Sequence, residues 1–374
     1  MKQIIQGTLV LLIFGSLLGG CKIPPNMKEF NAYMNLAQRA ENPEEKIRYY
    51  DNALSVWRKG MPLEAKANAY CGIGIGFRQK KQYEQALRMI TVAITIMPKN
   101  HIFRNERALV YSDRKEYDLA LEDVEKSLTA NPNFASAFFT RGNIYFQQNK
   151  YDEALKDMNR SIQLEPKFYP VYSIRAKTYV ALGEDEKAIA DFTKVIRNKK
   201  NSSQAYFDRG TAYGNTKEYD RAIYDLNKSI KLDPNNPHAY LYRGIFYFIQ
   251  GKYPYALNSF DRMLRLDKDY VAGYLYRGFA LLEMGEIKTA EINFKQVRSR
   301  DINNTEAAIG MALLSYYKGK KMDGIFFYKK AITLKPDYAL PIKELIAKKE
   351  FFYLRHHGKA LEYLKKEYKR ISSF

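Results

Sequence analysis

Apolar and polar residues alternate along this chain in a pattern that repeats. In residues 135–168 a first amphipathic run holds Phe138 and Tyr145 at helical spacing and breaks at Asn149-Lys150. A second run follows and ends at Glu165-Pro166, because proline cannot continue a helix and restricts the residue before it. The pattern predicts two antiparallel helices in each unit.

The same unit returns every 34 residues across most of the chain. The step is marked by an arginine followed by a small residue: Arg107-Ala108, Arg141-Gly142, Arg175-Ala176, Arg209-Gly210, Arg243-Gly244 and Arg277-Gly278. It is marked again by an alanine: Ala86, Ala120, Ala154, Ala188, Ala222, Ala256 and Ala290. Self-similarity at such a period indicates a solenoid, and eight windows without insertion cover residues 67–338.

Further landmarks give the unit a family resemblance. They are Gly142, Tyr145, Ala154, Met158, Ser161 and Pro166, which recur as Gly210, Tyr213, Ala222, Leu226, Ser229 and Pro234. With these landmarks the chain resembles the tetratricopeptide repeat. The resemblance implies an all-α fold, a right-handed superhelical solenoid of antiparallel helix pairs with about eight units and degenerate caps. Gly142 and Ala154 should lie where the two helices of a pair cross closely.

The residues outside the eight windows divide into further segments. They are a signal peptide (1–20), a tether (21–29), a divergent N-terminal helix pair (30–66) and, after the repeats, a degenerate ninth unit with a basic cap (339–374). Helical periodicity places the terminal helices at 30–40, 47–57, 340–354 and 359–371.

The N-terminal segment resembles that of bacterial lipoproteins. Met1-Lys2 gives a positive start, an apolar stretch follows, and Leu18-Gly19-Gly20-Cys21 looks like a lipobox, whose cysteine becomes lipidated. The alternative is an ordinary cleaved signal with an incidental cysteine. By the same resemblance, Lys22 after the cysteine indicates the outer membrane, facing the periplasm. Several acyl chains on Cys21 would hold the protein on a membrane, because each buried methylene adds about 0.8 kcal/mol.

The chain is strongly basic, with a formal net charge of +20. Such a charge suits a module that binds a polyanion, which is the alternative function. The polyanion would be nucleic acid, anionic polysaccharide or lipid. An envelope location argues against nucleic acid. Basic residues gather near the C-terminus: Lys348, Lys349, Lys359, Lys365, Lys366, Lys369 and Arg370. This basic patch is either a solvated face that keeps a terminal unit soluble or a docking site for anionic headgroups or an acidic partner.

The sequence contains no recognisable catalytic or metal-binding motif. The histidines are His101, His238, His356 and His357, and there is no HExxH, phosphate loop, GxSxG or CxxC pair. We therefore expect no enzyme activity, cofactor, metal or small-molecule substrate. The recurring arginine has a possible partner sixteen residues later, which predicts ion pairs to four aspartates and hydrogen bonds to two polar residues: Asp123, Asp157, Asp191, Asp225, Ser259 and Asn293.

In the family that the chain resembles, partners bind along the concave surface lined by the first helices. The residues expected there are mixed in the early windows, with Asn105, Phe139, Asn143, Phe146 and Lys177. In the later windows they form an apolar strip: Leu241, Ile245, Phe248, Leu275, Phe279, Leu282, Ile309, Leu313 and Tyr316. A contiguous apolar patch is typical of a binding site, unless tighter superhelical packing or the C-terminal helices cover it. The sequence favours a non-enzymatic, lipid-anchored scaffold of the bacterial envelope that binds a peptide or partner protein in this groove.

The lipid anchor can be tested by Cys21→Ala. We expect the variant to move from the membrane fraction to the soluble periplasm, because it lacks the acylated side chain. Fractionation followed by immunoblotting measures the change, and Lys22→Ala serves as a control for substitution near the cleavage site. Retention of Cys21→Ala in membranes at high salt would show that the anchor is not a lipid on this residue.

Overall fold

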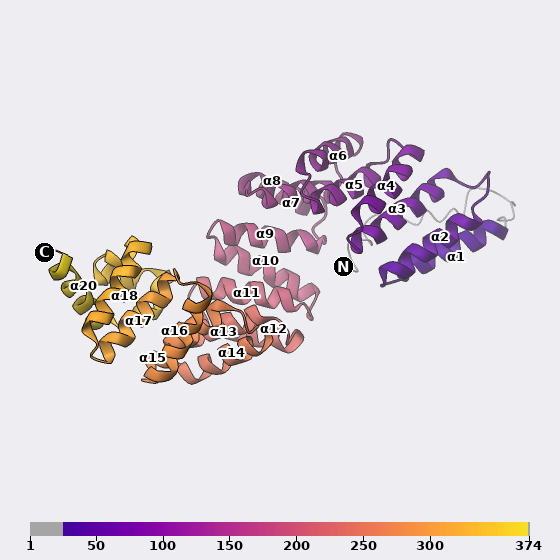
Figure 1. The fold of residues 1–374 in the computed structure, drawn as a ribbon. Helices are drawn as coiled ribbons and strands as arrows, with labels where there is room; N and C mark the ends of the chain where they lie inside the picture. The colour runs from indigo at the N-terminus through magenta and orange to yellow at the C-terminus, as the bar shows by residue number, and fades with distance from the viewer. Residues whose placement is uncertain (1–24, 373–374) are drawn as a thin grey trace. The chain divides into compact units, whose positions relative to one another are not determined.

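The structure is a computed structural model that describes residues 25–372. These residues form 20 α-helices and two short 3-10 helices, and no strand lies among them. The fold is the all-α solenoid of antiparallel helix pairs that the sequence predicts (Figure 1). Two compact units divide the chain between Val195 and Ile196.

Unit 1 contains the N-terminal helix pair and the first repeats. Its helices are α1 (Pro25–Arg39), α2 (Pro43–Val56), α3 (Leu63–Gln79), α4 (Tyr83–Ile96), α5 (His101–Asp113), α6 (Tyr117–Ala130), α7 (Ala135–Gln147), α8 (Tyr151–Leu164), α9 (Tyr169–Ala181) and most of α10 (Asp185–Asn198). Asn42 caps α2, because its side chain accepts a hydrogen bond from the Glu44 amide at 2.8 Å.

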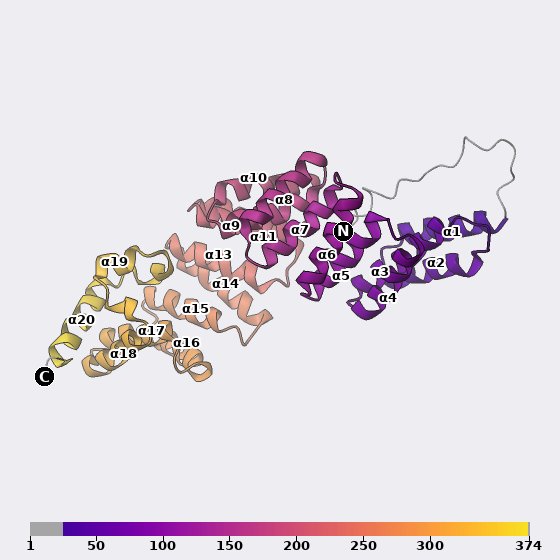
Figure 2. The same ribbon diagram turned by 90° about the horizontal axis from the view of Figure 1, so that it is seen from above.

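Unit 2 contains the later repeats and the C-terminal elements. They are α11 (Ser203–Asn215), α12 (Tyr219–Leu232), α13 (Pro237–Ile249), α14 (Tyr253–Leu266), α15 (Val271–Glu283), α16 (Ile287–Arg300), α17 (Thr305–Tyr317), α18 (Lys321–Leu334), η1 (Pro336–Ala339), α19 (Ile342–Ala347), η2 (Lys349–Leu354) and α20 (Gly358–Ser372). In Figure 2, α19 lies on the side of α13, α15 and α17 and away from α16 and α18.

In each of the eight repeats, one residue of the turn between the two helices has a left-handed backbone conformation. It is glycine in four repeats, at Gly183, Gly251, Gly285 and Gly319, and lysine or asparagine in the others, at Lys81, Lys115, Asn149 and Lys217. Their φ angles lie between 60° and 77°. This backbone region favours glycine and tolerates asparagine, so the turn is defined by its conformation rather than by one residue type.

The helices of a pair cross at the small residues that the sequence indicated. A Cβ atom on Gly142 would lie 3.2 Å from the Ala154 carbonyl oxygen, and Ala154 is fully buried. A Cβ on Gly244 would lie 2.4 Å from the Phe260 ring. The small residues are therefore required by close packing between two helices.

The recurring arginine makes the predicted ladder of contacts in five of six repeats. Its Nε atom lies 2.7 Å from the aspartate in each of the first four: Arg107–Asp123, Arg141–Asp157, Arg175–Asp191 and Arg209–Asp225. Arg243 donates to the Ser259 hydroxyl at 3.1 Å. The prediction for Arg277 is wrong: it pairs with Asp261 at 2.9 Å, because the Asn293 amide donates to the Thr289 carbonyl on its own helix.

Both ends of the chain differ from the predicted boundaries. Helix α1 begins at Pro25, inside the expected tether, because proline suits the first turn of a helix and buried Phe30 anchors it. The expected helix 340–354 is interrupted, and only residues 342–347 are α-helical before η2. At Phe351 the backbone leaves helical geometry, with φ −102° and ψ 25°. Cys21 and the signal segment lie outside the described residues.

Among the described helices, none combines the length and apolar character needed to span a membrane.

The helix crossing at Gly244 can be tested by Gly244→Leu. We expect a loss of roughly 1–3 kcal/mol in the free energy of unfolding, because the added side chain overpacks the contact with Phe260. Gly244→Ala is the matched control and should lower the free energy of unfolding by less. An alanine already fits this position in another repeat, where Ala176 is equivalent to Gly244 and Phe192 to Phe260, and both are buried. Urea titration followed by circular dichroism measures both, and equal midpoints would mean that the crossing lies elsewhere.

Candidate functional site

The apolar strip predicted as a binding groove is part of the core of unit 2. Phe279, Ile309 and Leu313 are fully buried, and Leu241, Phe248, Leu275 and Leu282 are at most 7% exposed. Ile245 and Tyr316 are half-buried. The prediction that these side chains form an open surface is therefore wrong, and the alternative that C-terminal elements cover them is correct.

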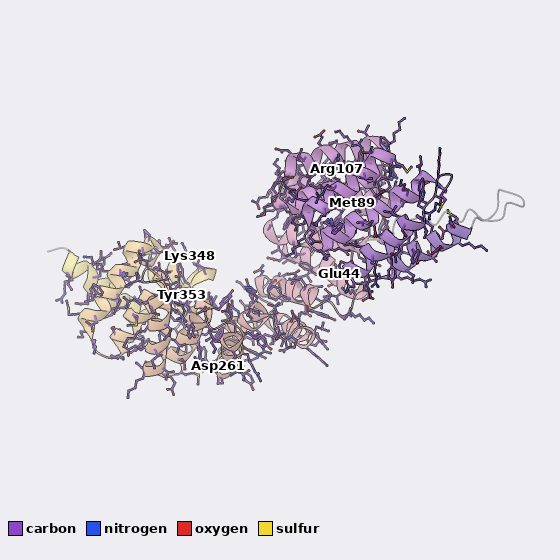
Figure 3. All side chains as sticks on the ribbon, turned by 45° about the vertical axis from the view of Figure 1, so that its right-hand side comes forward. Glu44, Met89, Arg107, Asp261, Lys348 and Tyr353 are labelled. Atoms are coloured by element: carbon purple, nitrogen blue, oxygen red, sulfur yellow. The ribbon has the colours of Figure 1, made fainter. Side chains whose placement is uncertain are left out.

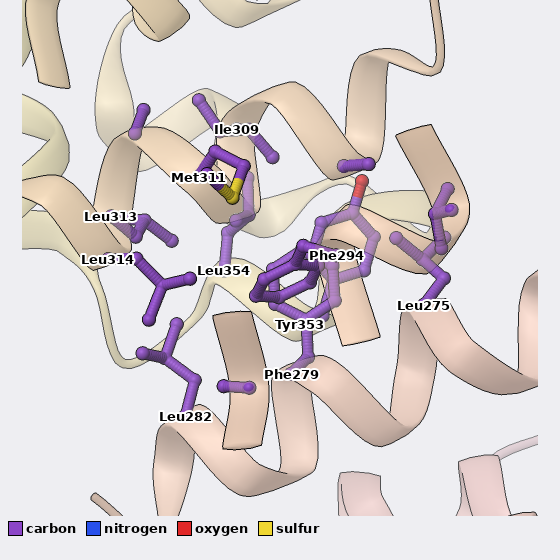
Figure 4. Packing of buried hydrophobic residues seen from close by; sticks show 14 of the residues in the cluster. Leu275, Phe279, Leu282, Phe294, Ile309, Met311, Leu313, Leu314, Tyr353 and Leu354 are labelled. Carbon is purple, nitrogen blue, oxygen red and sulfur yellow. The ribbon is translucent and has the colours of Figure 1, made fainter. Parts of the chain in front are cut away.

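The cover is a short stretch of chain between α19 and α20, which we call the closing segment (residues 350–357). The Tyr353 ring lies 4.4 Å from the Phe279 ring, and the Phe352 ring lies 5.6 Å from Phe248 and 5.5 Å from Tyr276. Figure 4 shows Tyr353 and Leu354 among the strip residues, and Figure 3 shows Tyr353 within the helices of unit 2. The closing segment thus lies across the first helices of three successive repeats.

The sequence contained one signal of this arrangement. Phe351-Phe352-Tyr353-Leu354 is an unbroken apolar run, and consecutive residues of a helix cannot all lie on one stripe. Phe351, Tyr353 and Leu354 are all at most 2% exposed. A run of this kind is buried on every side, so it predicts contact with a second surface, although it does not show which one.

A histidine at the end of the closing segment is also buried. His357 is only 4% exposed. Its Nδ1 atom lies 2.9 Å from the Tyr317 hydroxyl, and its Nε2 atom lies 3.2 Å from Glu283 Oε1. Within residues 25–372 no group of three histidine, cysteine or carboxylate side chains is placed to hold a metal ion.

The basic patch is partly used for internal contacts. Lys365 Nζ donates to the carbonyl oxygens of Ala339 and Leu340 at 2.6 and 2.8 Å. Burial, with a smaller effect of Lys369, lowers the pKa of Lys365. Other members pair with carboxylates, Lys348 with Asp337 and Arg370 with Glu367. Lys359, Lys366 and Lys369 are exposed, and the side chain of Lys349 lies outside the described part.

Unit 1 presents a different inner face on α3, α5, α7 and α9. Phe139, Asn143, Phe146 and Lys177 are half-buried there, so apolar, amide and basic groups all reach solvent. Phe139 is held by an edge contact with Phe168 at 5.3 Å between ring centroids. This inner face, with Asn105, is the candidate site of unit 1.

Polar groups on α5 are buried without full partners. Asn105 is 2% exposed, and its side-chain oxygen accepts no hydrogen bond from the described residues. Burial raises the pKa of the neighbouring Glu106 carboxyl and of Asp113, although Arg78 opposes both shifts. Arg78 lies 3.8 Å from Asp113. Trp57, Gln82 and Gln148 of unit 1 also have a buried side-chain atom without a partner, so this feature alone does not mark Asn105 as a ligand contact.

Comparison with known families identifies the repeats. Profiles described as tetratricopeptide repeat match residues 135–168, 169–202, 203–236 and 226–258. The first three ranges coincide with windows read from the sequence. The chain therefore contains tetratricopeptide repeats. No curated protein of similar sequence was found.

Solved structures agree on the fold. A tetratricopeptide repeat protein from Parabacteroides merdae is 19% identical with a TM-score of 0.51, over 71% of this chain and 98% of that chain. The C-terminal part of a repeat-containing protein from Cytophaga hutchinsonii is also 19% identical with a TM-score of 0.51, over 64% and 98%. The Cut9–Hcn1 hetero-tetramer of the APC/C is 18% identical with a TM-score of 0.53, over 84% and 61%. At these identities the likeness concerns the fold alone.

The role of the strip as core can be tested by Phe279→Ala. We expect a loss of about 3–5 kcal/mol in the unfolding free energy of unit 2, because the ring is fully buried against Phe294 and Tyr353. Phe326→Ala is the control in the same unit, since Phe326 is 63% exposed and should change stability by less than about 0.5 kcal/mol. Similar denaturant midpoints for the two variants would mean that the strip is not packed as described.

Proposed function

We propose that this protein is a non-enzymatic, lipid-anchored scaffold of the bacterial envelope, which binds a peptide or a partner protein on the inner face of unit 1. Repeat solenoids use extended concave surfaces for binding, and the chain contains such repeats. The lipobox-like segment ending in Cys21 supports attachment to a membrane, by resemblance to an outer membrane facing the periplasm.

The observation that carries the proposal is the contrast between the two inner faces. The strip of unit 2 is closed by the chain itself, whereas Phe139, Asn143 and Phe146 of unit 1 remain partly open. An inner face with half-buried aromatic rings beside an amide suits a peptide, because rings bury apolar side chains and amides pair with a peptide backbone.

The basic composition supports a second function, binding of an acidic polymer by charge. Several basic side chains are already paired, however, including the arginines of the ladder and three members of the basic patch. Those cations have less charge to offer a polyanion than the composition implies. The two functions also differ in their response to salt, because release of counterions from a polyanion makes its binding steeply salt-dependent.

The proposal can be tested by Phe146→Ala in a pull-down from envelope extract at low and at physiological salt. We expect the captured partner to bind at least about tenfold more weakly to the variant, because aromatic residues at the centre of an interface carry much of the binding energy. Lys156→Ala, on the exposed part of α8, is the matched control and should bind like wild type. Binding that falls steeply with salt and is unchanged in Phe146→Ala would instead support binding of an acidic polymer by charge.

A further inference from the structure

The second helices of the repeats carry a row of three residues on the side away from the first helices, which we call the outer stripe. The three residues are spaced by four and then by three positions, and residues at this spacing lie on one face of a helix. On α6 the outer stripe consists of Asp118, Glu122 and Glu125, and all three are exposed. There the stripe is an ordinary charged surface.

The outer stripe has a different chemistry in the last two repeats. Its residues there are basic or apolar, and all are exposed: Lys288, Ile292 and Lys295 on α16, and Met322, Phe326 and Lys329 on α18. The three apolar side chains are 60%, 67% and 63% exposed, respectively. The two helices are neighbours, because the Arg298 guanidinium of α16 lies 4.7 Å from the centre of the Phe327 ring of α18.

Helix stability does not account for this change. The first residue of the stripe is acidic in five repeats and then not acidic in three: Glu84, Asp118, Asp152, Glu186 and Asp220, followed by Pro254, Lys288 and Met322. A carboxylate in the first turn stabilises a helix, because the N-terminus carries a partial positive charge, and a lysine there is unfavourable. Helix α16 has no acidic residue in its first turn, and α18 has Asp323. The last two stripes therefore replace a favourable helix contact by a basic and apolar surface.

Few carboxylates oppose the positive charge of this surface. Glu291 of α16 is paired with Lys318 and also lies 3.0 Å from Lys295. Asp323 is the other acidic residue of α16 and α18, and exposed Lys320 and Lys321 lie beside it in the sequence. The surface thus combines large exposed apolar side chains with an excess of cations.

We propose that the outer surface of α16 and α18 docks on an anionic phospholipid bilayer. Ile292, Met322 and Phe326 enter the boundary of the hydrocarbon region, and the lysines contact the headgroups. A bilayer offers negative charge at its surface and hydrocarbon beneath it. Lysine suits this arrangement, because its stem lies along apolar surface while its ammonium group stays in water. A soluble polyanion offers the charge but no apolar phase, so it leaves the exposed apolar side chains unexplained.

A second copy of this chain fits the same surface less well. Two such surfaces face to face would bring like charges together, which is unfavourable at an interface. The surface lies on the side of unit 2 away from α19 (Figure 2), so it is separate from the closing segment. The inference goes beyond the proposed function, because a lipid on Cys21 would hold the N-terminus, whereas this surface would hold unit 2 on the membrane.

Co-sedimentation with vesicles tests the proposal on the full chain carrying Cys21→Ala, so that no acyl chain contributes. We expect this protein to bind phosphatidylcholine vesicles containing phosphatidylglycerol at least about tenfold more tightly than vesicles of phosphatidylcholine alone. Adding Ile292→Ala/Phe326→Ala should weaken binding to the anionic vesicles at least about tenfold, because the apolar contacts are lost. Leu119→Ala, at an exposed apolar residue of α6, is the matched control and should leave binding unchanged.

A second pair of variants separates docking through this surface from general attraction of a basic chain. Lys288→Gln/Lys329→Gln should weaken binding to the anionic vesicles at least about tenfold. Lys156→Gln/Lys167→Gln removes the same charge from exposed positions of unit 1 and should weaken it less than about twofold. All variants keep the same N-terminal segment, so differences between them come from the substituted side chains. Equal effects of the two lysine pairs would overturn the proposal.

The depth of Phe326 in the bilayer decides the question independently of affinity. The sequence has one tryptophan, so Trp57→Phe/Phe326→Trp in the Cys21→Ala chain leaves a single indole, at the proposed docking surface. We expect lipids brominated on their acyl chains to quench its fluorescence, because the ring lies at the hydrocarbon boundary. Circular dichroism checks that the helices are retained.

Three results would overturn the proposal. Vesicle binding without quenching, or unchanged binding of Ile292→Ala/Phe326→Ala, would show attraction by charge alone. Dimers in sedimentation velocity that disappear in Phe326→Ala would assign the surface to a second copy. Capture of an envelope protein through Phe326 by a chain that binds no vesicles would assign it to a protein partner. None of these results depends on Phe146, so they are distinct from a failure of the proposed peptide site in unit 1.

Discussion

The stack of helix pairs depends on the recurring arginine, whose guanidinium can bond to two different helices. In each ladder repeat it holds the second helix of its own pair, and in several it also reaches the second helix of the preceding pair. Arg141 bonds to Asp157 and to Glu125, and Arg175 bonds to Asp191 and to Asn159. The aspartates are almost completely buried, so removal of one partner would leave an unpaired charge, which commonly costs about 3–5 kcal/mol. One side chain thus connects packing within a repeat to packing between repeats.

The electrostatics of the ladder change along the chain. The bidentate bond to Asp123 raises the pKa of the Arg107 guanidinium, and the bond to Asp157 does the same for Arg141. At Arg243 burial lowers the pKa, because Ser259 offers a hydroxyl in place of a carboxylate. The later repeats of unit 2 compensate with apolar packing, where Phe260 and Phe294 fill the crossings at Gly244 and Gly278. Ion pairs of the arginine ladder and apolar packing at the helix crossings therefore contribute in different proportions in the two units.

The sequence predicts the repeated part of the fold well and the ends poorly, and the reason is physical. A periodic pattern records which residues face a neighbour one repeat away, so Gly142 and the pair Arg141–Asp157 were both predictable. The partner of Arg277 was not predictable, because Asp261 and Asn293 can both accept a hydrogen bond from it. Which of them does so depends on side-chain geometry. The closing segment belongs to no repeat and contacts three of them, so no local pattern predicts its position. The unit 1 face was predicted as mixed and is partly open, yet the unpartnered oxygen of Asn105 required coordinates.

The inner face of unit 2 is apolar because the closing segment covers it. Ordering a loop residue costs roughly 1–2 kcal/mol of backbone entropy, and burying one large apolar side chain returns roughly 1.5–3 kcal/mol. Since Phe351, Phe352, Tyr353 and Leu354 stand together and three of them are at most 2% exposed, burial of their side chains outweighs the entropy of ordering their backbone, and the closed arrangement is favoured. The inner face of unit 2 is therefore core, whereas Phe139, Asn143 and Phe146 on the inner face of unit 1 are only half-buried.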